Sequence, residues 1–325
     1  MRAIGAPWPA RALPVRCQTA RTGPVRGSWP GAIPAPARRA RPPHARPLRT
    51  PPTHARLPFL EHANTAAKRW VSSVQSYVVL AWNAFRFIFA RPFYGGDLVQ
   101  QMDAMGVQSL GIVLLTGFFT GMVLALQSSV QLRTFGATQY IGSLVSASMI
   151  RELGPVLAGL MVAGRVGSGV AAQIGSMRVT EQIDALNTLG TDPIKKLVTP
   201  RVLAGVIMLP VLTVINDLVG ILGGNLIARV YVGLPSGFYW QTVWEQIRAG
   251  GFSFGLIPND FIQGLVKPFV FGGIIATTAC YYGLGTTGGT EGVGIATTRT
   301  VVASSISILV VDYFLTQILL AVFNA

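Results

Sequence analysis

Five charged side chains lie within stretches that are otherwise long and apolar: Arg151, Glu152, Asp217, Lys267 and Asp312. An ionisable group inside a bilayer is costly, so it usually faces a polar cavity or an opposite charge, and it marks a functional site. One interpretation is a cavity that receives a polar headgroup while apolar walls hold acyl chains. The other is a set of salt bridges that only fixes helix packing. We favour the cavity, because packing alone seldom needs paired charges.

Helical geometry predicts the depth of these charges. At about 1.5 Å of rise per residue, Arg151, Glu152 and Asp312 are expected well inside the bilayer, and Lys267 nearer the outer face. Arg165 lies closer to the cytoplasmic face, where its side chain is expected to snorkel to water.

Motifs for covalent chemistry are missing from the sequence. It contains no Walker A motif, no HExxH, no GxSxG and no Cys/His cluster, and its two cysteines are Cys17 and Cys280. A single GxGxxG at Gly283, Gly285 and Gly288 follows an apolar span rather than a strand, so we interpret it as a flexible loop. We predict a chain that is not an enzyme and holds no metal or cofactor.

The elements that position the charges follow from composition and hydropathy. Half of the residues are hydrophobic, 12% are charged and the mean hydropathy is +0.50, as in an all-α, polytopic membrane protein. Windows of about 20 residues predict transmembrane helices. The predicted spans are 107–131, 142–173, 202–231, 261–283 and 301–323.

Two regions precede the spans. Residues 1–58 hold eleven Arg, thirteen Pro and no acidic residue, which predicts a disordered tail. We interpret it as a transit peptide, as a basic arm for anionic lipid or nucleic acid, or, the interpretation we favour, as sequence translated from a wrongly assigned start. The remaining domain, 59–325, begins with an apolar helical pattern over 61–90 that includes Lys68 and Arg86. This pattern favours an interfacial helix over a plain first transmembrane helix, followed by a short helix from Asp97.

Loop charges predict the orientation. Cations flank one side of the spans, at Lys68, Arg69, Arg91, Arg178, Lys195, Lys196 and Arg201, whereas Arg133 and Arg248 are nearly alone on the other. The positive-inside rule then places the amino terminus in the cytoplasm and the carboxyl terminus outside. Residues 232–260, with Trp240 and Trp244, are expected at the outer face.

Between the second and third spans lies a polar, amphipathic segment, 176–200. A helix over 180–190 is predicted to begin at Thr180 with Glu181 in its first turn and to stop at Gly190. Its apolar positions, Ile183, Leu186 and Leu189, have helical spacing. A short cytoplasmic helix across a loop is suited to docking onto a partner. Small residues within the spans predict close helix contacts, in the pairs Gly117/Gly121, Gly164/Ser168 and Gly220/Gly224.

Several dispersed motifs resemble the MlaE (YrbE) permease family of ABC-type lipid transporters, whose chloroplast relatives are the TGD-type permeases. The motifs are RELGPVLAGLMVAGRVGSGVAAQIGSMRVTEQIDAL, LGTDPIKKLVTPR and GVGIATTRTVVASS. The resemblance implies a homodimer with a separate cytoplasmic ABC ATPase that binds the ATP, an MCE-domain partner, and phospholipid moved between inner and outer membranes.

The family's polar lipid-cavity positions correspond to Arg151, Glu152, Lys267 and Asp312. Its ATPase-docking segment corresponds to Glu181, Gln182, Asp184, Leu186 and Leu189. We expect a bacterial inner membrane, with the chloroplast inner envelope as the alternative, and no nucleic-acid partner. A stand-alone secondary transporter or channel, or a non-transporting scaffold, are the alternative functions.

Overall fold

The computed structural model divides the chain into two units, Met1–Arg56 and Leu57–Ala325. It describes residues 58–88, 94–249, 252–253 and 257–323. The predicted tail lies outside the described residues, apart from Pro58, and so does Arg91. Every described element therefore belongs to the second unit.

Five helical segments are long and apolar enough to cross a membrane, as predicted. They are Gly95–Thr134, Thr138–Val179, Ile194–Val232, Asn259–Leu284 and Gly289–Val322. Each includes a predicted span almost completely and extends beyond it. The first segment begins 12 residues before residue 107, since it includes the short helix predicted from Asp97, and the last segment begins 12 residues before residue 301. The first turns of this helix were missed because they hold several Gly and Thr residues, Glu291 and Arg299, which lower the local hydropathy.

The first two segments are composite helices. The first contains α2 (Gly95–Met105), a 3-10 turn (Val107–Ser109) and α3 (Leu110–Thr134). The second contains a 3-10 turn (Thr138–Tyr140), α4 (Ile141–Ser148), a π-helical turn (Met149–Leu153), α5 (Gly154–Val162), a second π-helical turn (Ala163–Gly167) and α6 (Ser168–Val179).

The other three segments are more regular. The third consists of α8 (Thr199–Ile227) with π-helical turns at its ends (Ile194–Val198 and Ala228–Val232). The last two are α10 (Asn259–Leu284) and α11 (Gly289–Phe323). Outside the five segments lie α1 (Pro58–Phe87), α7 (Gln182–Thr188), α9 (Ser236–Ala249) and the antiparallel strands β1 (Phe252–Ser253) and β2 (Ile257–Pro258).

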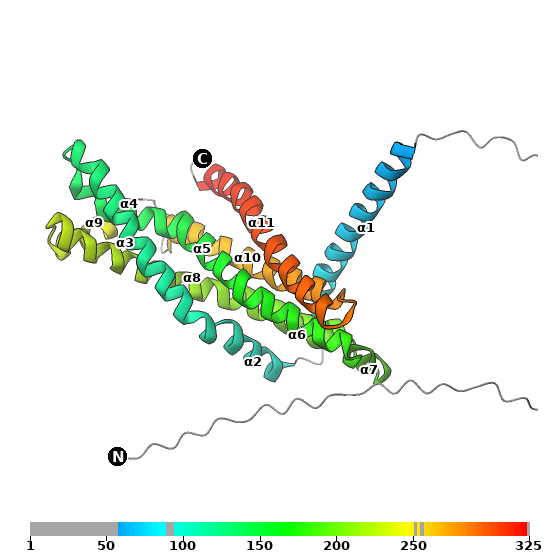
Figure 1. Cartoon of the computed structure of the whole chain (residues 1–325). Coiled ribbons are helices and arrows are strands. Elements are labelled where there is room, and N and C mark those ends of the chain that lie inside the picture. The colour runs from blue at the N-terminus through cyan, green and yellow to red at the C-terminus, as the bar shows by residue number, and fades with distance from the viewer. Residues whose placement is uncertain (1–57, 89–93, 250–251, 254–256, 324–325) are drawn as a thin grey trace, which may run out of the picture. The chain divides into compact units, whose positions relative to one another are not determined.

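Helix α8 packs against α3, α5 and α10, while α10 also contacts α6 and α11 (Figure 1). Glycines allow α3 and α8 to approach closely, because a Cβ atom on Gly121 would collide with the carbonyl group of Gly220. The predicted contacts of Gly117/Gly121 and Gly220/Gly224 are therefore confirmed. The prediction for Gly164 is wrong within this chain, because no atom lies within 4 Å of the position its Cβ would take.

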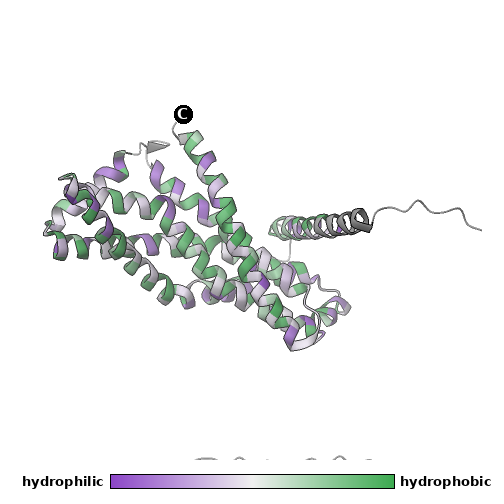
Figure 2. Cartoon of the chain, turned by 45° about the horizontal axis from the view of Figure 1, so that its top comes forward, coloured by the Kyte–Doolittle hydropathy of each residue, from purple (hydrophilic) through white to green (hydrophobic). Residues whose placement is uncertain are grey.

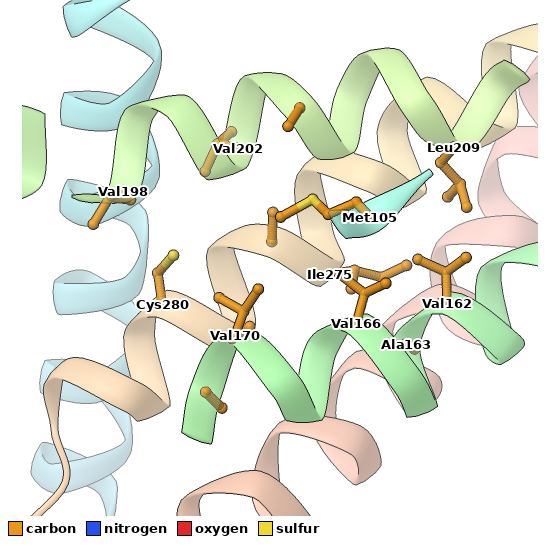
Figure 3. Close-up of a cluster of buried hydrophobic side chains, with 14 of the residues drawn as sticks. Met105, Val162, Ala163, Val166, Val170, Val198, Val202, Leu209, Ile275 and Cys280 are labelled. Atoms are coloured by element: carbon orange, nitrogen blue, oxygen red, sulfur yellow. The ribbon is translucent and has the colours of Figure 1, made fainter. Parts of the chain in front are cut away.

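A buried apolar core joins these helices (Figure 3). Val162, Val166 and Val170 recur at helical spacing along α5 and α6, and they face Ile275 of α10 and Leu209 of α8. Many large apolar side chains of the spans are exposed. The helices of the bundle are coloured as hydrophobic over much of their length (Figure 2). Apolar exposure along helices of this length is expected where lipid is the solvent.

Helices α1 and α9 contact the bundle through a few side chains. In α1, Leu80 and Ala84 are buried, whereas Val78 and Trp82 are exposed, a one-sided pattern that agrees with the predicted interfacial helix without testing its place in a membrane. In α9, the buried hydroxyl of Tyr239 donates to the carbonyl oxygen of Ile221 at 3.1 Å. Burial raises the pKa of Tyr239 well above its usual range.

Several cations near the predicted cytoplasmic side have defined partners in the structure. The Nζ atom of Lys196 lies 3.9 Å from Asp97 Oδ2. This ion pair joins the start of α2 to the segment before α8. Arg201, one of the predicted flanking cations, lies at the start of α8 and is buried, with only 4% of the residue exposed. Its guanidinium donates to the carbonyl oxygen of Leu197 and to Gln173 Oε1, so a buried polar network compensates its charge. Arg165 donates to Ser109 Oγ at 2.8 Å.

Candidate functional site

Arg151 and Glu152 project from a distorted turn in the second segment. Residues Met149–Leu153 form a π-helical turn, and Pro155 follows it in the first turn of α5. Proline has no backbone N–H, so the carbonyl oxygen of Arg151 cannot accept the usual helical hydrogen bond from residue 155. Single π-helical turns are frequent at functional sites. The turn thus presents two charged side chains and one free backbone acceptor.

Lys267 on α10 uses that free acceptor. Its ammonium donates to the carbonyl oxygen of Arg151 at 2.9 Å and to Glu152 Oε2 at 2.6 Å. It also lies 3.1 Å from Asp312 Oδ1 on α11, an ion pair. The side chain of Lys267 is only 2% exposed, so three oxygen neighbours offset the cost of burying its charge.

Close packing of α10 against the π-helical turn makes this contact reachable. A Cβ atom on Gly264 would collide with the carbonyl oxygen of Ile150. Only glycine therefore permits the two backbones to lie this close. Gly264 and Lys267 are three residues apart on a helix and share a face, so the close approach of one brings the ammonium of the other to the turn.

Arg151 has a partner that we did not predict. Its Nη2 atom donates to Asp260 Oδ1 at 2.7 Å, and the side chain of Asp260 is 3% exposed. Asp260 is in the first turn of α10, at the edge of the predicted outer segment, and was not considered as an intramembrane charge. The Nε atom of Arg151 is buried and has no hydrogen-bond partner among the described residues. The Arg151 side chain as a whole is still 37% exposed, so another part of it remains open to another molecule.

A cavity of about 310 Å³ opens beside these charges. Arg151, Glu152 and Lys267 line it, and Leu319 and Leu320 of α11 form an apolar part of its wall. Glu152 is held at its rim, where the side chain of Glu152 is 43% exposed and Thr316 Oγ1 donates to Glu152 Oε1. The structure thus combines both interpretations of the sequence, because the charges pair with one another and also border a cavity.

Asp312 is part of the charged cluster but not of the cavity lining. Lys267 was expected nearer the outer face than Glu152 and Asp312, and its side-chain contacts bring all three charges together. Asp217 was expected to share the same polar environment, and it lies elsewhere. Its Oδ1 atom occupies the position that a Cβ atom on Gly154 would take, and it has no hydrogen-bond partner among the described residues.

The predicted docking helix is present but shorter than expected. Helix α7 begins at Gln182, and Glu181 precedes it with a left-handed backbone, φ 60°. Thr180 belongs to the end of α6, so the prediction of Thr180 as the start of the helix is wrong. Four of the five proposed docking residues are exposed: Glu181, Gln182, Asp184 and Leu189. Leu186 is partly buried against the core together with the buried Ile183. It therefore packs α7 onto the bundle and does not belong to the exposed surface of the helix.

Leu189 is the most exposed apolar residue near α7, at 78%. Beside it, Asp184 pairs with Arg178 Nη1 at 2.6 Å, and both side chains are substantially exposed. Gly190 ends the turn with φ 73°, as the sequence predicted for a helix stop. The segment therefore offers an acidic and amide surface with one projecting leucine.

Comparison with known proteins agrees with this geometry. The family model described as permease MlaE matches residues 98–318, which include all five segments nearly completely. A probable ABC transporter permease protein of Rickettsia conorii is 45% identical over 259 residues, which cover 79% of this chain and 96% of that protein.

Two further relatives come from distant organisms. The intermembrane phospholipid transport system permease protein MlaE of Haemophilus influenzae is 40% identical, over 68% of this chain and 82% of its own length. The chloroplastic protein TRIGALACTOSYLDIACYLGLYCEROL 1 of Arabidopsis thaliana is 34% identical, over 82% of this chain and 73% of its own length. With a family match over most of the chain and relatives aligned over most of their lengths, this protein belongs to the MlaE permease family of ABC transporters.

Proposed function

We propose that this chain is the permease subunit of an ABC transporter that moves phospholipid between inner and outer membranes, driven by a separate ATPase chain. The relative from Haemophilus influenzae is named as an intermembrane phospholipid transport permease, which supports the substrate class. The observation that carries the proposal is the cavity in which Arg151 and Glu152 lie next to the apolar side chains of Leu319 and Leu320.

This combination is suited to a molecule with a charged head and apolar tails. The exposed part of the Arg151 side chain, which lines the cavity, can bind a phosphate oxygen, because guanidinium and phosphate form strong, charge-assisted hydrogen bonds. Glu152, with a partly exposed carboxylate, can accept from an amine or hydroxyl of the headgroup. Acyl chains would pack on the leucines of α11. Lys267 and Asp312 act as positioning residues, because they hold Glu152 and α11 in place.

We further propose that the ATPase docks on the exposed residues around α7, Glu181, Gln182, Asp184 and Leu189. Because Ile183 and Leu186 join α7 to the core of the bundle, movement of the docked ATPase would reach α6 directly. A second copy of this chain and an MCE-domain protein complete the proposed assembly. A bacterial inner membrane is the proposed location, given that most of the named relatives are bacterial.

Purification of the tagged full chain in mild detergent tests the proposal. Mass spectrometry should find an ABC ATPase, an MCE-domain protein and bound phospholipid. The variant Arg151→Gln should retain about tenfold less phospholipid, since it loses a charge-assisted hydrogen bond, while the partner proteins remain. Arg248→Gln is the matched control, because it removes an exposed arginine of α9 that does not line the cavity. Recovery of the chain without ATPase and without lipid would favour a stand-alone transporter or a scaffold.

A further inference from the structure

A second and larger cavity lies at the opposite end of α10. It has a volume of about 670 Å³ and is enclosed by α1, the end of α10 and the first turns of α11. The end of α1 and the connection between α10 and α11 are neighbours in Figure 1. None of the residues that line it also lines the cavity at Arg151, so the two are separate sites.

Three contacts hold α1 beside this cavity. The rings of Tyr77 and Tyr281 meet edge to face at a centroid distance of 5.7 Å. The hydroxyl of Tyr77 lies 3.2 Å from Thr278 Oγ1, and the hydroxyl of Tyr281 donates to the carbonyl oxygen of Ser73 at 3.3 Å. Helix α1 therefore forms a defined wall of the cavity.

The polar part of the lining is typical of an anion site. Arg299 is its only charged residue, and the hydroxyl groups of Tyr282 and Thr287 belong to the same lining. The Ser76 hydroxyl, also in the lining, donates to the carbonyl oxygen of Ser72. No carboxylate belongs to the lining, and none of the described acidic residues forms an ion pair with Arg299. A guanidinium without a protein counter-ion, next to several hydroxyl donors, matches the oxygens of a phosphate group.

The remaining lining is apolar and includes Leu80, Leu284 and Ile295. Ile295 is 46% exposed, so an apolar surface continues from the cavity to the outside of the bundle. A soluble phosphate gains nothing from such a wall, whereas a phospholipid would place its headgroup at Arg299 and its chains along it. The exposed apolar residues of α1, among them Val78 and Trp82, extend this surface.

We propose that this cavity binds the phosphate-bearing headgroup of an anionic membrane lipid, and that the bound lipid fastens α1 to the α10–α11 connection. Anionic lipids are abundant in the leaflet that faces the cytoplasm, and the cavity lies at the end of the bundle that the positive-inside rule assigns to that side. This lipid is distinct from the transported one, because it occupies a different cavity and contacts the only helix of the described chain that precedes the five spans.

Native mass spectrometry of the purified full chain, titrated with phosphatidylglycerol or phosphatidylcholine, tests the proposal. The wild type should bind one phosphatidylglycerol at this site in addition to any lipid in the Arg151 cavity. Arg299→Gln should weaken phosphatidylglycerol binding about tenfold, and Arg299→Lys should restore most of it. Lys68→Gln is the matched control, since it removes an exposed cation of α1 that does not line the cavity.

Two further measurements test whether the lipid occupies this cavity and whether a soluble anion can replace it. Ser76→Trp fills the cavity from the exposed face of α1 and leaves the charge of Arg299 in place, so it should also prevent binding. Inorganic phosphate at millimolar concentration should not displace the lipid. Displacement by phosphate would instead assign the site to a soluble anion. Equal lipid binding by the wild type, Arg299→Gln and Ser76→Trp would overturn the proposal.

Discussion

The ammonium of Lys267 lies 2.6 Å from the carboxylate of Glu152, and it also donates to the backbone carbonyl of the residue before it, Arg151. One buried side chain of α10 therefore binds both the backbone and a side chain of the π-helical turn, and with Asp312 it links α11 to them. The charged residues of the candidate site form a joint between three helices as well as part of a cavity wall.

Loss of this ammonium should be strongly destabilising. Lys267→Met removes the counter-charge of Glu152 and Asp312, and unpairing a buried ion pair costs about 3–5 kcal/mol. Thermal unfolding of the purified variant in detergent measures the effect. Arg178→Met, which breaks an exposed pair, should cost less than about 1 kcal/mol. Equal losses in the two variants would contradict a structural role for Lys267.

Replacement of the whole cluster should separate stability from transport. The triple variant Glu152→Leu, Lys267→Met and Asp312→Leu leaves no unpaired charge at the joint, so it should be more stable than Lys267→Met alone. It also removes the charges of Glu152 and Lys267 from the cavity lining, so phospholipid transport between reconstituted membranes should be lost. A triple variant that transports normally would instead support a scaffold role for these charges.

A single methyl group should disturb the contact between α10 and the π-helical turn. Gly264→Ala places a Cβ atom against the carbonyl oxygen of Ile150, so the helices must separate at a cost of about 1–3 kcal/mol. Gly164→Ala is the control, because its Cβ meets no atom within 4 Å and alanine favours the helix by about 1 kcal/mol. Denaturation should thus show that the free energy of unfolding falls in Gly264→Ala and rises in Gly164→Ala. A change of the same sign in both variants would refute the packing argument.

Charge reversal near α7 should uncouple the ATPase. Replacing both Glu181 and Asp184 by Lys changes an exposed acidic surface to a basic one and leaves the buried contact of Ile183 intact. ATP hydrolysis by the assembled complex should no longer be stimulated, while thermal stability changes little. Glu245→Lys, a charge reversal on the exposed face of α9, is the control. Normal stimulation in the double variant would remove the docking assignment.

The five spans could be predicted well from the sequence, because long apolar windows depend on local composition. The first turns of α11 could not, since their threonines are polar on a hydropathy scale. In the structure those hydroxyls bond to the preceding helical turn: Thr297 and Thr298 both donate to the carbonyl oxygen of Gly294. A polar residue whose hydroxyl is satisfied within its own helix remains compatible with a helical segment.

The charged residues of the candidate site could be identified from the sequence, but the contacts between them could not. Opposite charges in apolar helices suggested pairing without naming partners, and in the structure Lys267 pairs with Glu152 and Asp312. Counting residues along each helix could not show how the helices align with one another, so the contact of Lys267 with the π-helical turn could not be predicted. Asp260 was overlooked for the same reason, because its role depends on the position of Arg151 in a different segment.

The backbone conformation of Glu181 lowers the stability of the fold. It is the only described residue other than glycine with a positive φ, and a left-handed conformation costs a side-chain-bearing residue about 1–2 kcal/mol. Glycine at this position would make the fold more stable and would also remove an exposed carboxylate from the proposed docking surface. Stability and partner recognition therefore favour different residues at the junction of α6 and α7, and Glu181 is the choice that favours recognition.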